Sequence, residues 1–476
     1  MSRPLSTIRQ KIQTILHTSP QTILLFLWAF AAVSLYIGLF FPYFGEEGVY
    51  TASSFEMLHN HLFTSVYFMG GYFGRPPLYN WLILGVAHFI GYPHMLIAAR
   101  FVTITLTIGT SLLTYWFTHA ITKDKTFSLF SVICFLSGDL LFRSSWIAYA
   151  DPTFSFFTVG AMCFMWVGAT QKKYSWLSIA IPFLIAAFLT KALTCYAFYG
   201  VTVLILLCKE KKWRYFFHPI SILLHLVALI FPLLWLLFFT HHQSGRMLWD
   251  LLHNFSQNTF SLTHTISQFI SKTATYFLRF APLSLIALYC LLSRKKNKNR
   301  DNNAPWVNTM LLCVVINFLP YWLTPGVYQT RYLLPLFPFI AILMAHVIYH
   351  STQKIMCFTI YTLAFFIGMK LCLSPFGLPW FEHMSYEYPS IAKKLFIETK
   401  SFPLYANDND SLIATLDAMR YPDSPVIQPP EHATNLFLVG NAANKHDQLV
   451  KKYHVTDRHF GVYCRGLACL KLKKET

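Results

Sequence analysis

Charged side chains occur in five short segments of this sequence, each at the end of a long apolar run. The acids in these segments are Glu46, Glu47 and Asp151, and the bases are Arg75, Lys191 and Arg331. A carboxylate that is partly removed from water has a raised pKa and is suited to general-base chemistry. A fixed guanidinium or ammonium group is suited to holding a phosphate. If the segments meet on one side of a membrane, they form a site with acids for a reaction and cations for a phosphate.

Each acid also has a structural interpretation. Glu46 and Glu47 stand where a helix is expected to begin, and negative charge near a helix N-terminus stabilises it by a few tenths of a kcal/mol. Asp151 precedes Pro152, and an acid before a proline at the first helical position is a favoured helix start. For Asp151 a capping function and a chemical function are compatible, so both stay open.

The bases have structural alternatives too. Arg75 and Arg331 flank apolar runs, where a long cationic side chain can extend to lipid headgroups. Lys191 interrupts the apolar stretch 183–199. A charge there is costly unless it faces a polar cavity or a turn at the membrane surface. Taken together, the acids and bases favour a substrate that is both a lipid and a phosphate.

The composition is that of a membrane protein with many spans. Apolar residues make up 55% of the 476 and aromatic residues 17%, and apolar runs of about 18 residues or more recur along the chain. The first of these runs, 22–41, lacks the small-residue cleavage site of a signal peptide and is interpreted as retained. The net charge of +18 comes mostly from short loops and the tail, a distribution typical of the positive-inside bias. It therefore does not indicate nucleic-acid binding.

The basic loops predict which segments face outward. Arg3, Arg9 and Lys11 precede the first span, so the N-terminus is predicted to be cytoplasmic. The segment 76–90 is marginal for spanning because it holds only about 15 residues and begins with two prolines. If it crossed, every later basic loop would lie outside, against the charge rule. It is therefore predicted to lie along the outer interface.

This choice gives eleven predicted transmembrane helices and an outer tail. The predicted spans are 22–41, 95–120, 126–146, 152–170, 175–190, 192–208, 218–240, 276–293, 305–323, 332–350 and 355–373. An amphipathic helix at 47–62 and the segment 76–90 are predicted to be two interfacial juxtamembrane helices, joined by a turn rich in glycine. All five charged segments then fall on the outer side.

From residue 374 the apolar runs shorten and the charge density rises. Helices at 386–399, 411–419 and 446–453, strands at 402–406 and 435–439, and a hairpin at 460–472 predict a small α/β domain. The chain therefore divides into a membrane domain, 1–373, and an extracytoplasmic domain, 374–476. In the tail, Cys464 and Cys469 are candidates for a disulfide. The other eight cysteines lie in apolar stretches and are interpreted as packing residues.

Sequence motifs for other chemistries are missing. The histidines of the loop before residue 275 lack the compact spacing of a metal site; they are His241, His242, His253 and His264. The sequence contains no phosphate-binding glycine loop, no Ser-His-Asp arrangement and no paired-cysteine redox motif. No metal site is therefore predicted.

The order of the charged motifs resembles that of a known family. The motifs are Glu46-Glu47 with Tyr50, Arg75-Pro76-Pro77-Leu78 with Trp81, Ala150-Asp151, Thr190-Lys191-Ala192 and Arg331-Tyr332-Leu333-Leu334-Pro335. In this order, over residues 20–350, the chain is similar to the lipid-carrier-dependent glycosyltransferases of the GT-C fold. It most resembles the bacterial family 39/83-like group, which includes the lipid A aminoarabinose transferase and relatives of the protein O-mannosyltransferases. It departs from their usual pattern in three places: Glu46 replaces Asp, Arg75 replaces Lys, and Ala192 replaces Gly.

The resemblance implies an inverting sugar transfer from a polyprenyl-phosphate-linked donor to a lipid, glycan or protein acceptor. The reaction would take place at the periplasmic face of a bacterial inner membrane. Arg75, Lys191 and Arg331 would hold the donor phosphate, and Glu46 would orient or deprotonate the acceptor. Glu47 and Asp151 would shape the acceptor site, with Tyr50 and Tyr332 in support. The resemblance implies no obligatory cofactor, although a divalent metal at the acids is compatible with it.

Two other classes of function remain as alternatives. A transporter or flippase of lipid-linked or anionic solutes would need ionisable residues near the middle of the membrane and, preferably, two matching halves. The charges instead cluster at span ends on one side, and the tail has no counterpart in the N-terminal half. A non-catalytic assembly protein would tolerate replacement of the acids and bases.

Overall fold

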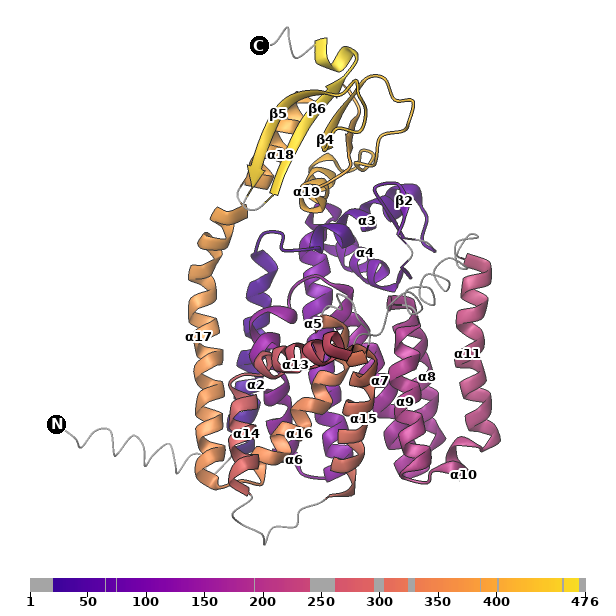
Figure 1. Cartoon of the computed structure of the whole chain (residues 1–476), viewed down its shortest axis with the longest axis vertical. Helices are drawn as coiled ribbons and strands as arrows, with labels where there is room; N and C mark the ends of the chain where they lie inside the picture. Colours follow the sequence, from indigo (N-terminus) through magenta and orange to yellow (C-terminus); the bar gives the residue numbers. More distant parts are fainter. Residues whose placement is uncertain are drawn as a thin grey trace, which may run out of the picture.

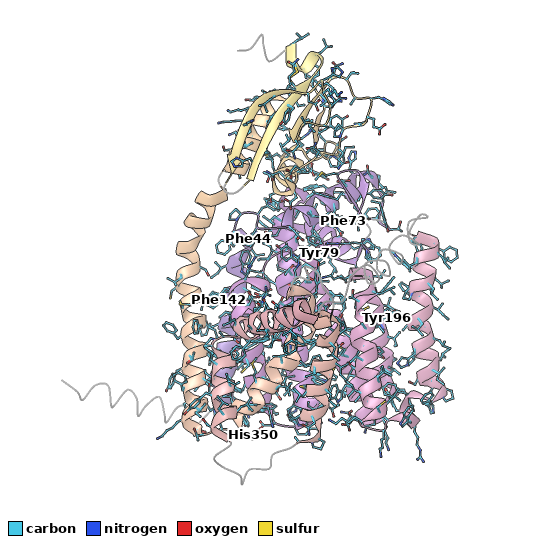
Figure 2. The ribbon with its side chains drawn as sticks, viewed as in Figure 1. Phe44, Phe73, Tyr79, Phe142, Tyr196 and His350 are labelled. Carbon is cyan, nitrogen blue, oxygen red and sulfur yellow. A yellow bond between two sulfur atoms is a disulfide. The ribbon has the colours of Figure 1, made fainter. Side chains whose placement is uncertain are left out.

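A bundle of helices with a small α/β domain at one end makes up the molecule (Figure 1). The structure is a computed structural model, and it describes residues 20–64, 66–73, 75–191, 193–239, 262–294, 304–323, 330–385, 387–399, 402–455 and 458–470. The C-terminal domain stands above the end of the bundle that carries α3 and α4, and His350 marks the opposite end (Figure 2).

Among the described residues, seven helices are long and apolar enough to cross a membrane. Each one matches a predicted span. They are α2 (Pro20–Tyr36, continued by η1, Ile37–Phe40), α5 (Met95–Thr122), α7 (Ala150–Gln171), α8 (Tyr174–Lys191), α11 (Pro219–Phe239), α16 (Phe337–Tyr349, preceded by η4, Thr330–Leu336) and α17 (Gln353–Ser385). The α7 helix is central: it packs against α5, α8 and α9, and most of its side chains are buried.

The remaining predicted spans are shorter or broken. The α9 helix (Thr194–Cys208) and α15 (Pro305–Leu323) are short but continuous. The α6 helix (Lys125–Phe135) ends well before residue 146 and is followed by a π-helical turn, η3 (Leu140–Ser144). The predicted helix 276–293 is two helices, α13 (Leu262–Arg279) and α14 (Leu283–Arg294), bent by 105°. Single continuous helices at 126–146 and 276–293 were therefore wrong predictions.

The two breaks have a common physical cause, because they pack against each other. Gly138 adopts a left-handed conformation with φ +58°, and a Cβ there would lie 2.2 Å from the carbonyl oxygen of Arg279. Pro282 follows Arg279 closely and lacks the N–H that a continuous helix needs. The side chains of Asp139 and Arg279 form an ion pair across the junction at 3.3 Å. A contact between segments 140 residues apart leaves no periodic signal in the sequence.

The two predicted juxtamembrane helices are α3 (Glu47–Asn60) and α4 (Leu78–Ile90). A short β-hairpin, β1 (Tyr67–Phe68) and β2 (Gly71–Tyr72), lies between them. However, α3 does not lie along an interface with one face exposed: from Glu47 to Met57 every residue except Val49 is buried. The C-terminal helix α19 (Asp410–Arg420) covers it. A Cβ at Gly48 would lie 2.4 Å from the backbone of Asp410, so this close contact requires glycine.

The C-terminal domain has the predicted α/β character. Its elements are α18 (Glu387–Glu398), β3 (Leu404–Ala406), α19, β4 (Leu436–Gly440), β5 (Gln448–Val455) and β6 (Arg458–Arg465). The strand order is β3-β4-β6-β5, with β3 parallel to β4 and the other pairs antiparallel. Cys464 and Cys469 are joined by a disulfide at the end of β6. The α17 helix passes through residue 373, where the domain boundary was predicted, and ends at Ser385.

Two details of this domain differ from the sequence prediction. The segment 446–453 was predicted as a helix, but its residues 448–453 belong to β5. Within the predicted hairpin 460–472, the described residues 460–470 continue β6 into a short helical turn. The β5 strand lies at the edge of the sheet, and the exposed Lys451 and Lys452 are typical of edge strands. Its conformation depends on pairing with β6, which local helix propensity does not reveal.

Two carboxyl groups are buried where α3 meets α19. The Glu56 carboxylate accepts hydrogen bonds from the backbone N–H groups of Met69 and Gly70, and Asp417 accepts one from Val426 at 2.7 Å. Burial raises the pKa of Glu56 from 4.5 to about 7, although the two N–H donors oppose the shift. Burial likewise raises the pKa of Asp417 well above its usual range. Both carboxyl groups therefore bind a proton more tightly in the folded protein than in the unfolded chain.

We expect Glu56 to make the folded protein less stable as the pH rises from 4.5 to about 7. The native state holds the Glu56 proton more tightly than the unfolded state does, so unfolding releases a proton in this range and stability falls with pH. A shift of this size corresponds to roughly 3 kcal/mol. Glu56→Gln cannot titrate, so the unfolding temperature of this variant in detergent should rise relative to that of the wild type between pH 4.5 and 7.5. A constant margin would contradict the prediction.

Candidate functional site

Four of the charged segments meet at the end of the bundle beneath the C-terminal domain. Asp151 is the second residue of α7, and Lys191 is the last residue of α8. Arg331 lies in η4, and Glu46 immediately precedes α3. The α7 and α8 helices are consecutive and antiparallel, so the N-terminus of α7 lies beside the C-terminus of α8. The sequence prediction that these residues share one end of the bundle is confirmed by their direct contacts.

Arg331 bridges the two acids. Its Nη2 donates to Oε2 of Glu46 at 2.7 Å, and its Nε lies 3.3 Å from Oδ2 of Asp151. The Arg331 side chain is 11% exposed, and that of Glu46 is 42% exposed. The guanidinium also lies over the ring of Tyr149, 4.2 Å from its centroid. Glu46 is therefore the acid of this cluster that solvent or a substrate can reach.

Lys191 pairs with the buried Asp151 in the same cluster. The Lys191 ammonium donates to Oδ1 of Asp151, whose side chain is only 3% exposed. It also lies over the ring of Tyr332, 3.7 Å from the centroid. Two cations thus compensate one buried carboxylate and fix its orientation. Tyr332 contributes a cation–π contact.

Arg75 approaches the cluster from the segment before α4. It donates a hydrogen bond to the hydroxyl of Tyr50, and its guanidinium lies 4.5 Å from the ring centroid of Phe73. Tyr50 is buried on α3, with its ring against those of Tyr79 and Tyr149. Arg75 is therefore held by aromatic groups and has no carboxylate partner among the described ion pairs.

Tyr50 also reports on the electrostatics of the site. Burial raises its pKa to about 12; Arg75 and Arg331 oppose this shift, and Asp151 and Glu46 add to it. All four charged groups are thus close enough to influence one phenol. At neutral pH Tyr50 stays protonated and offers its oxygen to Arg75.

Glu47 differs from its neighbour Glu46 in its burial and in its ion-pair partner. Its carboxylate pairs with Arg100, with Nε at 2.8 Å, and both side chains are fully buried. It also accepts the backbone N–H groups of Phe44 and Ala148 at 2.8 and 2.7 Å. Arg100 in turn donates to backbone carbonyls in and just after η1, including that of Gly38 at 3.0 Å. This geometry favours a structural function for Glu47 over the predicted contact with an acceptor.

Several residues of this region were not identified from the sequence. A surface pocket beside the cluster is lined by Arg143, Ser144, Tyr149, Asp151, Arg279 and Arg331, among others. Tyr149 accepts a hydrogen bond from the backbone N–H of Glu46 at 3.3 Å, and a Cβ at Gly45 would lie 2.2 Å from its hydroxyl. Arg143 and Arg279 reach the pocket only because α6 and α13 break. The charge of Arg143 inside the predicted span 126–146 was the available signal.

The acids of the cluster are also the residues at which the resemblance allows a metal ion to bind. Among the residues the structure describes, no group of three or more His, Cys, Asp or Glu side chains could hold a metal ion. His241, His242, His253 and the side chain of His264 lie outside the described residues, as does Ala192 of the Thr-Lys-Ala motif. The expectation that no cofactor is required, with a divalent metal at the acids compatible, is not tested by this structure.

Sequence comparison relates the chain to sugar transferases. A family model described as dolichyl-phosphate-mannose-protein mannosyltransferase matches residues 22–244. The undecaprenyl phosphate-alpha-4-amino-4-deoxy-L-arabinose arabinosyl transferase of Enterobacter sp. (strain 638) is 25% identical over 327 residues, 65% of this chain and 55% of that protein. The enzyme of the same description from Wigglesworthia glossinidia brevipalpis is 29% identical over 154 residues, 30% of this chain and 27% of that protein. The chain thus aligns with about half of the first relative and about a quarter of the second.

Structure comparison identifies the fold. ArnT from Cupriavidus metallidurans bound to undecaprenyl phosphate matches with a TM-score of 0.68 at 12% identity, over 94% of this chain and 98% of ArnT. Its apo state matches with a TM-score of 0.62 at 14% identity. The Archaeoglobus fulgidus oligosaccharyltransferase in complex with Zn and sulfate matches with 0.51 at 11% identity, over 82% and 61% of the two chains. These matches confirm the predicted GT-C fold and the resemblance to its glycosyltransferases.

Proposed function

We propose that this chain, which has the GT-C fold, is a membrane glycosyltransferase that uses a polyprenyl-phosphate-linked sugar. The observation that supports the proposal most directly is the cluster of Lys191 and Arg331 around Asp151, with Glu46 exposed at its edge. The family match over residues 22–244 and the similarity to arabinosyl transferases agree with it. The acceptor is a lipid, glycan or protein at the periplasmic face of a bacterial inner membrane.

The cations provide the electrostatic part of the mechanism. Arg75, Lys191 and Arg331 hold the phosphate of the donor, and they stabilise the negative charge that develops there as the bond between C1 of the sugar and the phosphate oxygen breaks. Asp151 keeps two of these cations in place. The apolar flanks of the bundle hold the polyprenyl chain, so that only its phosphate reaches the polar end.

Glu46 serves the acceptor. As the acceptor oxygen attacks C1 from the side opposite the leaving phosphate, the new bond forms with inversion, and Glu46 orients the hydroxyl and takes its proton. The electron pair of the broken bond stays on the polyprenyl phosphate. If the acceptor is itself a phosphate, it needs no base and Glu46 only positions it. Tyr50 and Tyr332 orient Arg75 and Lys191 through the contacts described above.

Transfer assays with radiolabelled polyprenyl-phosphate sugars and membrane extracts test this proposal. We expect Lys191→Ala to lower transfer by at least about 100-fold, because it removes a group that stabilises the leaving phosphate. Glu46→Gln should lower transfer about 100-fold for a hydroxyl acceptor and only a few-fold for a phosphate acceptor.

The matched control is Lys125→Ala, because Lys125 is exposed and lies at the end of the bundle opposite the cluster. Its neighbour Asp124 contacts Tyr349, which adjoins His350 at that end. This variant should transfer sugar at the wild-type rate. Transfer that survives both Glu46→Gln and Lys191→Ala would refute the site. A wild-type protein that transfers sugar from no donor would favour a transporter or an assembly protein.

A further inference from the structure

A short segment links the C-terminal domain to the region of Arg75. Residues Val66–Phe73, here called the docking hairpin, contain β1 and β2 and end two positions before Arg75. The strands pair in register Tyr67↔Tyr72, and Phe73 donates its backbone N–H to the carbonyl of Val66 at 2.9 Å. The docking hairpin therefore moves as one unit.

Its tip contacts the C-terminal domain. The backbone N–H of Gln428 donates to the carbonyl of Met69 at 3.1 Å. Gly70, with φ +76°, faces Ile427: a Cβ at this glycine would lie 3.6 Å from that of Ile427. The carbonyl of Ile427 accepts the N–H of Ala406 in β3 at 2.9 Å. The tip thus contacts a connecting segment that is itself hydrogen-bonded to β3, at the edge of the sheet.

Glu56 fixes the same tip from the opposite side. Its two carboxylate oxygens accept the backbone N–H groups of Met69 and Gly70, the latter at 2.9 Å. The side chain is buried, with the residue only 1% exposed. Two bonds to consecutive N–H groups define the orientation of the turn as well as its position. No other side chain makes a hydrogen bond to these two N–H groups within the described part of the chain.

The base of the docking hairpin contacts Arg75. The ring of Phe73 lies 4.5 Å from the Arg75 guanidinium, and it packs 5.9 Å from the ring of Phe68, centroid to centroid. Arg75 also bonds to Tyr50, which stands on α3 together with Glu56. Figure 2 shows Phe73 and Tyr79 at the end of the bundle next to the C-terminal domain. The position of Arg75 therefore depends on α3 and on the docking hairpin together.

We propose that Glu56 is a positioning residue that holds the docking hairpin against the C-terminal domain and thereby sets the position of Arg75. The C-terminal domain is then part of the phosphate-binding machinery, although none of its described residues contributes a side chain to the cluster. This inference rests on the proposed function in one respect, namely that Arg75 binds the donor phosphate. A displacement of such a group by about 1 Å is enough to change activity severely.

The first measurement does not depend on catalysis. Amide hydrogen exchange of the full-length protein in detergent should be faster at residues 66–73 in Glu56→Ala than in the wild type. Glu56→Gln, which keeps one acceptor oxygen, should lie between them. Ile427→Ala, which changes the other side of the contact and removes no buried charge, should accelerate exchange in the same peptide.

The second measurement is binding and turnover. We expect Glu56→Ala to weaken binding of undecaprenyl phosphate and raise the donor KM by about 10-fold, with kcat changed less than threefold. Glu56→Gln should restore most of the affinity, and Ile427→Ala should weaken it about threefold. The control is Glu431→Ala, because Glu431 is exposed on the same domain, and this variant should match the wild type in both measurements.

The outcomes separate the two proposals. Faster exchange in the docking hairpin with unchanged phosphate binding would overturn the positioning inference while leaving the enzyme proposal intact. Unchanged exchange in both Glu56→Ala and Ile427→Ala would overturn it as well. A wild-type protein that neither binds undecaprenyl phosphate nor transfers sugar would instead refute the proposed function. If Glu56→Ala does not fold, the Ile427→Ala and Glu56→Gln results decide.

Discussion

Replacing Arg331 with alanine is expected to lower kcat/KM for transfer by about 1,000-fold. One guanidinium contacts both Glu46 and Asp151, so its loss removes a phosphate ligand and also leaves Asp151 with Lys191 alone. Removal of a single group that stabilises developing negative charge typically costs 100-fold to 1,000-fold. The measurement is initial rate against donor concentration, with the same acceptor for all variants.

The Arg331→Lys variant tests whether geometry or charge matters. A lysine keeps the charge but has no planar fork, and it cannot bridge two carboxylates in the observed way. We therefore expect an intermediate loss of about 30-fold. Arg214→Ala is the matched control, because Arg214 is an exposed arginine on α10 (Trp213–Phe216), away from the cluster. An Arg331→Ala protein with normal folding and wild-type turnover would contradict the assignment.

Glu47→Gln is expected to destabilise the protein by about 3–5 kcal/mol, whereas Glu46→Gln should change stability little. Removing one partner of a buried ion pair leaves the other charge without compensation, and this is the costly case. Arg100 would remain fully buried after the substitution. The measurement is the free energy of unfolding of both variants in detergent, determined from thermal or denaturant unfolding curves.

These two adjacent glutamates act as controls for each other. The Glu46 side chain is 42% exposed, so its amide can be solvated when the pair with Arg331 weakens, and exposed pairs contribute little to stability. Glu46→Gln should therefore lose activity and keep stability, and Glu47→Gln should lose stability first. Equal destabilisation by both substitutions would show that the buried pair with Arg100 does not hold the start of α3 in place.

A large part of the fold was predictable because its signals are local. The hydrophobic length of a run determines whether it can cross a membrane, and the seven long helices match predicted spans. The distribution of lysine and arginine predicted that 76–90 does not cross. That single choice placed Glu46, Asp151, Lys191 and Arg331 at one end of the bundle, where they are found in contact. The sidedness of the membrane and the cytoplasmic N-terminus remain predictions from the charge rule.

The errors occurred where conformation depends on distant contacts. The breaks after α6 and α13 exist because Gly138 and Arg279 pack together, and the edge strand β5 exists because β6 pairs with it. The burial of α3 depends on α19, more than 350 residues further along the chain. Periodicity within a window of residues reports none of these three contacts, so the sequence prediction failed where tertiary pairing decides the conformation.

The sequence by itself determined the class of the protein and the inventory of its chemistry: a helical membrane protein with acids and bases at one end. Only the tertiary structure decided which acid pairs with which base. Glu46 and Glu47 are neighbours of identical type, yet one faces Arg331 and the other Arg100, because successive residues at the start of a helix point in directions about 100° apart. Which direction leads to solvent and which to the core is set by the helices packed around α3, and no local pattern contains that information.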